Sequence, residues 1–141
     1  MYGAIFFTVA LLVTTAYFLM GGVPLLTLKH DIPLDARFVR SFFNVYYRVA
    51  LCASLGACIS YMVWGRYVFA LGAALFAAVT AVLRPHLVSA MERLGGKIEA
   101  CETSAIRNFR RVHSAALAIN VVQLVFIVWG ILRLSQELTP R

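Results

Sequence analysis

The chain has 141 residues, enough for one domain, and 62% of them are hydrophobic while only 13% are charged. Soluble domains carry roughly 25% charged residues, and a domain of this size has too little interior to bury so much apolar surface. The composition therefore excludes an ordinary soluble fold. The formal net charge of +7 comes from basic residues between apolar runs, which fits membrane lipids as partners and disfavours nucleic acid.

The first apolar run extends from Met1 to Leu28 and contains no charged side chain. Because roughly 20 residues of helix cross the hydrocarbon of a bilayer, we expect a membrane span over about 4–26. A cleavable signal peptide is the alternative. It would require basic residues before its apolar core, and this run opens with none.

An interfacial helix is predicted next, over about 32–45. Asp31 supplies a capping acid ahead of Pro33, a pattern typical of a helix start. A polar set of Arg37, Arg40 and Asn44 lies opposite apolar residues that recur at helical spacing, namely Phe38, Phe42, Val45 and Tyr46.

The second and third spans are expected over about 46–64 and 67–83, and the third can continue beyond Pro85. Only Gly65 and Arg66 separate the two spans, which requires a tight antiparallel hairpin. Together with the first and last spans they predict an all-α, integral membrane, antiparallel four-helix bundle that forms one domain over residues 1–141.

The fourth span is expected over about 112–132, after a cytoplasmic helical loop over about 92–111 with a break at Gly95-Gly96. Aromatic residues near the predicted span ends match an interfacial belt: Tyr46, Tyr47, Trp64, Tyr67 and Trp129.

The orientation follows from the basic residues. Ten of the thirteen Lys and Arg residues lie in the segments 29–48 and 84–111, and the opposite side has only Arg66, Arg133 and Arg141. Because basic loops stay in the cytoplasm, both termini are predicted to face outward, into the periplasm if the membrane is a bacterial inner (plasma) membrane.

Small side chains in the first three spans predict close helix contacts inside lipid. Gly56 and Ser60 in the second span are candidate packing or partner contacts. The sets are Thr8, Thr15 and Gly22 in the first span, Ala53, Gly56, Ala57 and Ser60 in the second, and Ala70, Ala74, Ala77 and Ala81 in the third.

The fourth span carries a polar stripe at helical spacing, formed by His113, Ala116, Asn120, Gln123 and Gly130. An unpaired amide in hydrocarbon costs several kcal/mol, so Asn120 and Gln123 are expected to face the bundle, a cavity or another protein. Hydrogen bonds between helices and a functional pocket are the two interpretations of this stripe.

Cysteines and histidines give no metal signature. Cys52, Cys58 and Cys101 have no ligand-like spacing, and we interpret them as small apolar packing residues. His86 and His113 flank the cytoplasmic loop and are the candidate ligands if haem is bound. His30 lies on the same side, without a spacing that defines a metal site.

Three landmarks resemble a known pattern. They are Gly21-Gly22-Val23-Pro24 at the end of the first span, Leu83-Arg84-Pro85 at the end of the third, and Arg110-Arg111-Val112-His113 followed by Asn120 in the fourth. Together they resemble the small four-helix membrane families typified by transmembrane protein 205 and the bacterial domain of unknown function 4149. A more distant similarity is to four-helix membrane proteins like the anthrone oxygenases. These resemblances imply an architecture, and no catalytic residue carries over.

Three functions remain open. The first is a non-enzymatic accessory or scaffold subunit of a larger membrane complex, bound to other membrane proteins or to itself. The second is a redox protein that holds haem or quinone. The third is a small-molecule transporter, but transport favours an ionisable group deep in a span, and the span interiors lack Asp, Glu, Lys and Arg.

Overall fold

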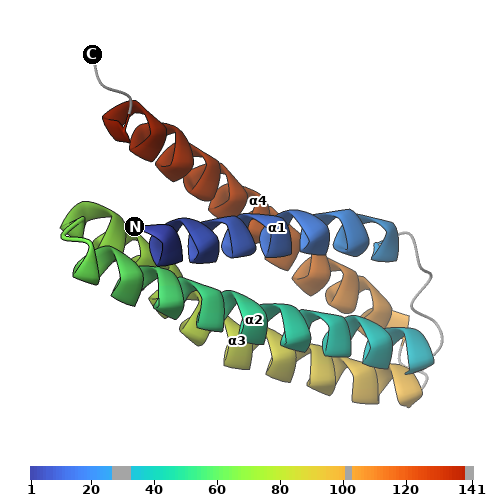
Figure 1. Cartoon of the computed structure of the whole chain (residues 1–141). Coiled ribbons are helices and arrows are strands. Elements are labelled where there is room, and N and C mark those ends of the chain that lie inside the picture. Colours follow the sequence, from blue (N-terminus) through green and yellow to red (C-terminus); the bar gives the residue numbers. More distant parts are fainter. Residues whose placement is uncertain (27–32, 101–102, 139–141) are drawn as a thin grey trace.

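The computed structural model describes residues 1–26, 33–100 and 103–138, and within them the chain forms four α-helices and no strand. The helices are α1 (Tyr2–Leu25), α2 (Pro33–Val63), α3 (Tyr67–Glu99) and α4 (Thr103–Leu138). This confirms the predicted all-helical, four-helix architecture (Figure 1). By length and composition, each of the four helices could cross a membrane.

The helices occupy the corners of a bundle. Within the described chain, close backbone contacts join α1 to α2, α2 to α3, α3 to α4 and α1 to α4, and the diagonal pairs make none. The start of α1, the α2–α3 turn and the last turns of α4 lie towards one end, called here the hairpin end (Figure 1). The opposite end, called the basic end, is formed by residues 33–43, 87–99 and 103–113.

Gly65 closes the turn between α2 and α3. Its φ of 76° is positive, a backbone conformation that is strained for any residue with a Cβ atom. The amide of Gly65 donates to the carbonyl of Met62 at 3.0 Å, and the amide of Arg66 donates to the carbonyl of Tyr61 at 2.9 Å. These two bonds define a Schellman cap. The expected tight hairpin therefore forms because α2 ends in this cap, with glycine at the position that requires a positive φ.

One expected break is absent from the backbone. The segment predicted as an interfacial helix leads directly into the second span, and from residue 33 both lie in α2. α3 likewise continues through Pro85 and through Gly95-Gly96 to Glu99. A Cβ on Gly95 would sit 3.7 Å from the Cβ of Ala36, an ordinary van der Waals distance, so this position packs against α2 within a continuous helix.

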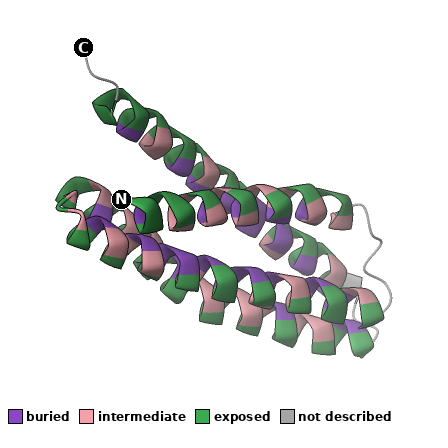
Figure 2. Cartoon of the chain, in the orientation of Figure 1, coloured by how far each residue is buried: buried purple, intermediate pink, exposed green. Residues whose placement is uncertain are grey.

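The apolar residues expected on one face of the interfacial helix divide between the surface and the core of the bundle. Phe38 and Val45, assigned to the apolar face, are exposed, whereas Tyr46 and Tyr47, assigned to the interfacial belt, are buried in the interior. Figure 2 shows that buried positions follow one side of α2, the side towards α1. The belt assignment of these two tyrosines is therefore wrong. The buried stripe consists of Ala36, Val39, Phe43, Tyr46, Tyr47, Ala50, Ala53, Ser54, Ala57 and Tyr61.

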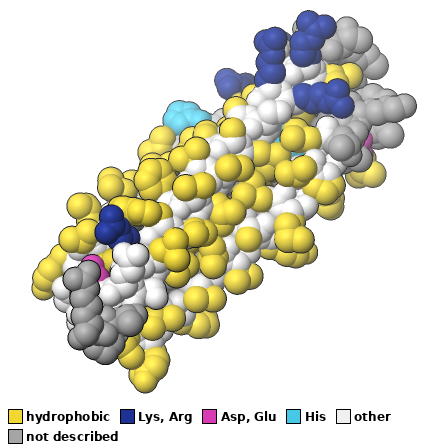
Figure 3. Space-filling view, turned by 90° about the horizontal axis from the view of Figure 1, so that it is seen from above, with side chains coloured by type: hydrophobic (Ala, Val, Ile, Leu, Met, Phe, Trp, Pro, Cys, Tyr) yellow, Lys and Arg dark blue, Asp and Glu magenta, His cyan; other side chains and the backbone are white. Residues whose placement is uncertain are grey.

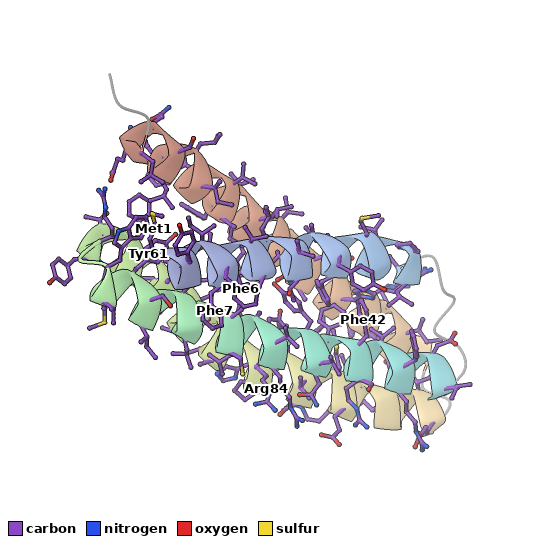
Figure 4. The ribbon with its side chains drawn as sticks, in the orientation of Figure 1. Met1, Phe6, Phe7, Phe42, Tyr61 and Arg84 are labelled. Carbon is purple, nitrogen blue, oxygen red and sulfur yellow. The ribbon has the colours of Figure 1, made fainter. Side chains whose placement is uncertain are left out.

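Glycines bring the helices together at the predicted small-residue positions. A Cβ on Gly56 would lie 2.6 Å from the ring of Phe7, which packs against α2 from α1 (Figure 4). A Cβ on Gly22 would lie 2.6 Å from the side chain of Leu117 in α4. Ser60 lies beside Gly3, whose Cβ would be 3.2 Å from the Ser60 hydroxyl. In α3, Ala70 and Ala77 are buried, but Ala81 is exposed.

Candidate functional site: a buried polar layer

Two threonines of α1 bind tyrosines of α2. The Thr8 hydroxyl donates to the carbonyl of Ala4 at 2.7 Å and lies 2.9 Å from the hydroxyl of Tyr61. A hydroxyl has one proton to donate, so Tyr61 is the donor to Thr8. Seven residues later, Thr15 donates to the carbonyl of Leu11 at 2.8 Å and accepts a longer, 3.5 Å bond from Tyr46.

The α4 stripe faces the centre of the bundle. His113, Ala116 and Asn120 have no exposed surface, Gln123 is 7% exposed, and Gly130 is half-buried. The amide nitrogen of Asn120 donates to the carbonyl of Ala116 at 2.8 Å. Of the two polar atoms of the amide only the nitrogen carries hydrogen and can donate, so this bond fixes the amide orientation and turns the Asn120 Oδ1 away from its own helix.

Side chains from diagonal helices meet in the middle. The ring of Phe43 in α2 makes an edge-on contact with His113 in α4, with centroids 5.1 Å apart. One turn of α2 beyond Phe43, Tyr47 lies next to Asn120, which is two turns of α4 beyond His113. The two side chains are near enough to interact, although no hydrogen bond of normal geometry joins them. The helix backbones stay apart here because these side chains fill the space between them.

Several polar atoms in this layer have no hydrogen-bond partner among the described residues. They are the Tyr47 hydroxyl, the Thr80 hydroxyl, the Asn120 Oδ1 and both amide atoms of Gln123. Arg66 in the α2–α3 turn pairs with Glu137 in α4. Thr80 is as many residues from Arg66 as Gln123 is from Glu137, so the two side chains lie at the same level of α3 and α4. The unpaired groups therefore gather near the middle of the bundle, where such atoms are costly.

The layer contains neutral donors and acceptors. Its hydroxyls and amides can bind water or another neutral polar group, and they supply no carboxylate. Among the described residues, no group of three or more His, Cys, Asp or Glu side chains could hold a metal ion. Cys52 is exposed and Cys58 is half-buried, while Cys101 lies outside the described residues.

The two candidate haem ligands have different surroundings. His113 is fully buried, but His86 is exposed on α3. Two axial ligands must point into one enclosed space with iron between them, and the structure does not bring these two histidines together in that way. His30 lies outside the described residues.

Ion pairs lie at both ends of the bundle. At the hairpin end, Arg66 pairs with Glu137. At the basic end, Arg37 binds Glu99 at 2.9 Å and Arg40 binds Glu92 at 2.8 Å, both across α2 and α3. Figure 3 shows basic side chains gathered mainly at one end, a smaller basic group near the other end, and hydrophobic side chains over the length between the ends.

Arg84 is an exception to this pairing. Its Nε donates to the Oδ1 of Asn44 at 3.2 Å, in a partly buried position between α3 and α2 (Figure 4). In the sequence Arg84 marks only the end of the third span, as part of Leu83-Arg84-Pro85, and nothing there predicts its contact with Asn44. The sequence feature that could have indicated its role is an arginine directly before Pro85, about one bilayer thickness along α3 from the hairpin.

The sequence also gave no reason to select Thr80 or Tyr47. A lone threonine in an apolar helix and a tyrosine near a predicted span end are both common without any special role. Only the packing of α2, α3 and α4 makes these hydroxyls part of one layer.

No family model matches the sequence, and no curated protein or solved structure matches it significantly.

Proposed function

We propose that the protein is a multi-pass integral membrane protein, and that it serves as a non-enzymatic accessory or scaffold subunit of a larger membrane complex. The basic end lies in the cytoplasm and both chain termini lie on the opposite side of the membrane. If the host is a bacterium, this membrane is the inner membrane. The basic asymmetry of the sequence supports this orientation.

The exposed apolar surface supports the membrane location. α3 alone presents a run of large apolar residues to the outside, formed by Tyr67, Val68, Leu71, Leu75, Val79 and Val82. Only 17% of the most apolar 18-residue window of α3 is buried inside the protein. Soluble monomers rarely expose contiguous apolar patches of more than a few hundred Å², and lipid is the solvent in which such a surface is stable.

The outer half of α4 is the observation on which the subunit role depends. Between residues 121 and 132, only Gln123 and Ile127 are buried, so apolar side chains are bare around most of the helix. A shallow apolar groove on this helix is lined by Leu124, Val125, Val128, Trp129 and Leu132. A groove beside a bulky aromatic residue suits the ridge of a neighbouring transmembrane helix.

The internal polar groups support a structural use. Thr8, Thr15 and Asn120 bind their own backbone, and two of them also accept bonds from tyrosines of the same chain. Bonds of this kind fix the register of a bundle. The exposed position of His86 gives no support to the haem-binding alternative.

Site-specific photocrosslinking in native membranes tests the subunit role. A photoreactive residue at Val125 should capture one discrete membrane protein, because this position lines the α4 groove. The same residue at Leu71, on the exposed face of α3, is the matched control and should meet lipid alone. Equal crosslinking at both positions, no protein at either, or a product of twice the chain mass would contradict an accessory role.

A further inference from the structure

We propose that Arg84 and Arg48 form a binding site for the phosphate of an anionic membrane lipid, on the α2–α3 flank of the bundle. The site requires the membrane location proposed above and is independent of any partner subunit. Its elements are a positioned guanidinium, the lack of a carboxylate beside it in the part of the chain that the structure describes, and its depth along the helices.

The guanidinium of Arg84 is held in place by one neutral side chain. Its Nε donates to the Oδ1 of Asn44, and its terminal nitrogens make no hydrogen bond or ion pair with any residue that the structure describes. Arg84 is also partly buried. A partly buried cation is costly unless an anion binds it, so the terminal nitrogens are directed at a partner from outside the chain.

The nearby carboxylates are already occupied. Glu92 binds Arg40 and Glu99 binds Arg37, in both cases further towards the basic end. Asp35 lies in the first turn of α2, nine residues before Asn44. Across the described part of the basic end, the charge of Arg84 therefore has no acidic side chain to neutralise it.

Arg48 adds a second guanidinium. It follows Asn44 by one turn of α2, about 6 Å away on the same side of the helix, and its side chain is exposed. No described residue forms a hydrogen bond or ion pair with it. Two planar guanidiniums can bind the oxygens of one phosphate, the geometry that favours arginine over lysine for this ligand.

The depth of the site matches a lipid headgroup. Asn44 precedes the end of α2 at Val63 by 19 residues, about 28 Å of helix, and Arg84 follows Tyr67 by 17 residues, about 26 Å. The hydrocarbon of a bilayer is about 30 Å thick. When the hairpin lies at one surface, Arg84 therefore reaches the headgroup level of the other. Arg48 precedes Val63 by 15 residues, about 22 Å, and reaches the same level through its long side chain.

The surface towards the hairpin suits acyl chains. Exposed apolar side chains continue towards the hairpin from the two arginines, namely Val49 and Leu55 on α2 and Val79 and Val82 on α3. A free phosphate ion could use the arginines but would gain nothing from these side chains. For this reason we assign the site to a membrane phospholipid.

Native mass spectrometry of the detergent-solubilised full chain tests the assignment, with phosphatidylglycerol and phosphatidylcholine as probes. The wild-type protein should bind phosphatidylglycerol more tightly, by about fivefold for each arginine. Arg48→Gln should lose about fivefold of this preference, and Arg48→Gln with Arg84→Gln should lose all of it. Arg107→Gln is the matched control, since it removes an exposed charge from α4 at the same end, and it should keep the preference.

Equal binding of the two lipids by the wild-type protein would overturn the site, as would an unchanged preference in Arg48→Gln. The single variant decides the question even where the double variant fails to fold, because Arg48 is exposed. Displacement of the lipid by millimolar inorganic phosphate would show a free-anion site and also contradict the proposal. A failed crosslink at Val125 with an intact lipid preference would reject the subunit role alone.

Discussion

The hydroxyl of Thr8 accepts a hydrogen bond from Tyr61 at 2.9 Å, and this bond joins the start of α1 to the end of α2. The same arrangement recurs one heptad later between Thr15 and Tyr46. In each case the threonine also donates to the carbonyl four residues before it, which holds its oxygen towards α2. The first helix is thus fixed to the second at two depths by neutral hydrogen bonds.

Removing the first of these bonds should weaken the bundle. Tyr61→Phe keeps the ring packing and removes only the hydroxyl, so we expect the free energy of unfolding to fall by about 0.6–1.7 kcal/mol, the range for such bonds in membranes. Tyr67→Phe is the control, because the Tyr67 side chain is exposed. Unfolding in a detergent titration measures both. Equal losses in the two variants would mean that the Thr8–Tyr61 bond contributes nothing.

A methyl group at Gly56 should disturb the α1–α2 contact. Its Cβ would approach the ring of Phe7 to 2.6 Å, so the ring or the helix must move. We expect Gly56→Ala to cost about 1–3 kcal/mol of stability, the usual range for overpacking. Gly72→Ala meets no atom within 4 Å and should be neutral or slightly stabilising, because alanine favours helix. Thermal unfolding that ranks the two variants the other way would refute this packing.

Gln123 should behave differently from Tyr61. Neither atom of its buried amide has a hydrogen-bond partner among the described residues, so Gln123→Leu removes a desolvated group without breaking a bond. We expect the free energy of unfolding to rise by about 1 kcal/mol. Gln136→Leu, at an exposed position near the end of α4, should leave stability unchanged. A clear loss in Gln123→Leu would show that water or a partner binds this amide.

The number of helices and the inner face of α4 follow from simple sequence patterns. Apolar runs of about 20 residues leave little choice other than helices. On α4, a few polar side chains mark one face in an otherwise apolar helix, so the positions of His113, Asn120 and Gln123 predict the side that is buried.

The inner face of α2 could not be predicted in the same way. A helix that faces lipid is apolar on its outside as well, so hydrophobic periodicity does not distinguish the core from the surface. Phe38 and Tyr46 both fit an apolar face, yet the structure exposes Phe38 and buries Tyr46. The glycines of α3 present a related difficulty, because Gly95 fits both a helix break and a close helix contact until α2 is placed beside it.

We propose that the chain crosses the membrane four times with its basic end in the cytoplasm, and cysteine accessibility in intact cells measures this orientation. In a variant without the three native cysteines, a single cysteine is placed by Gln136→Cys at the hairpin end or by Arg107→Cys at the basic end. A membrane-impermeant maleimide should label Gln136→Cys in intact cells and Arg107→Cys only after permeabilisation. Labelling of Arg107→Cys in intact cells would contradict the account.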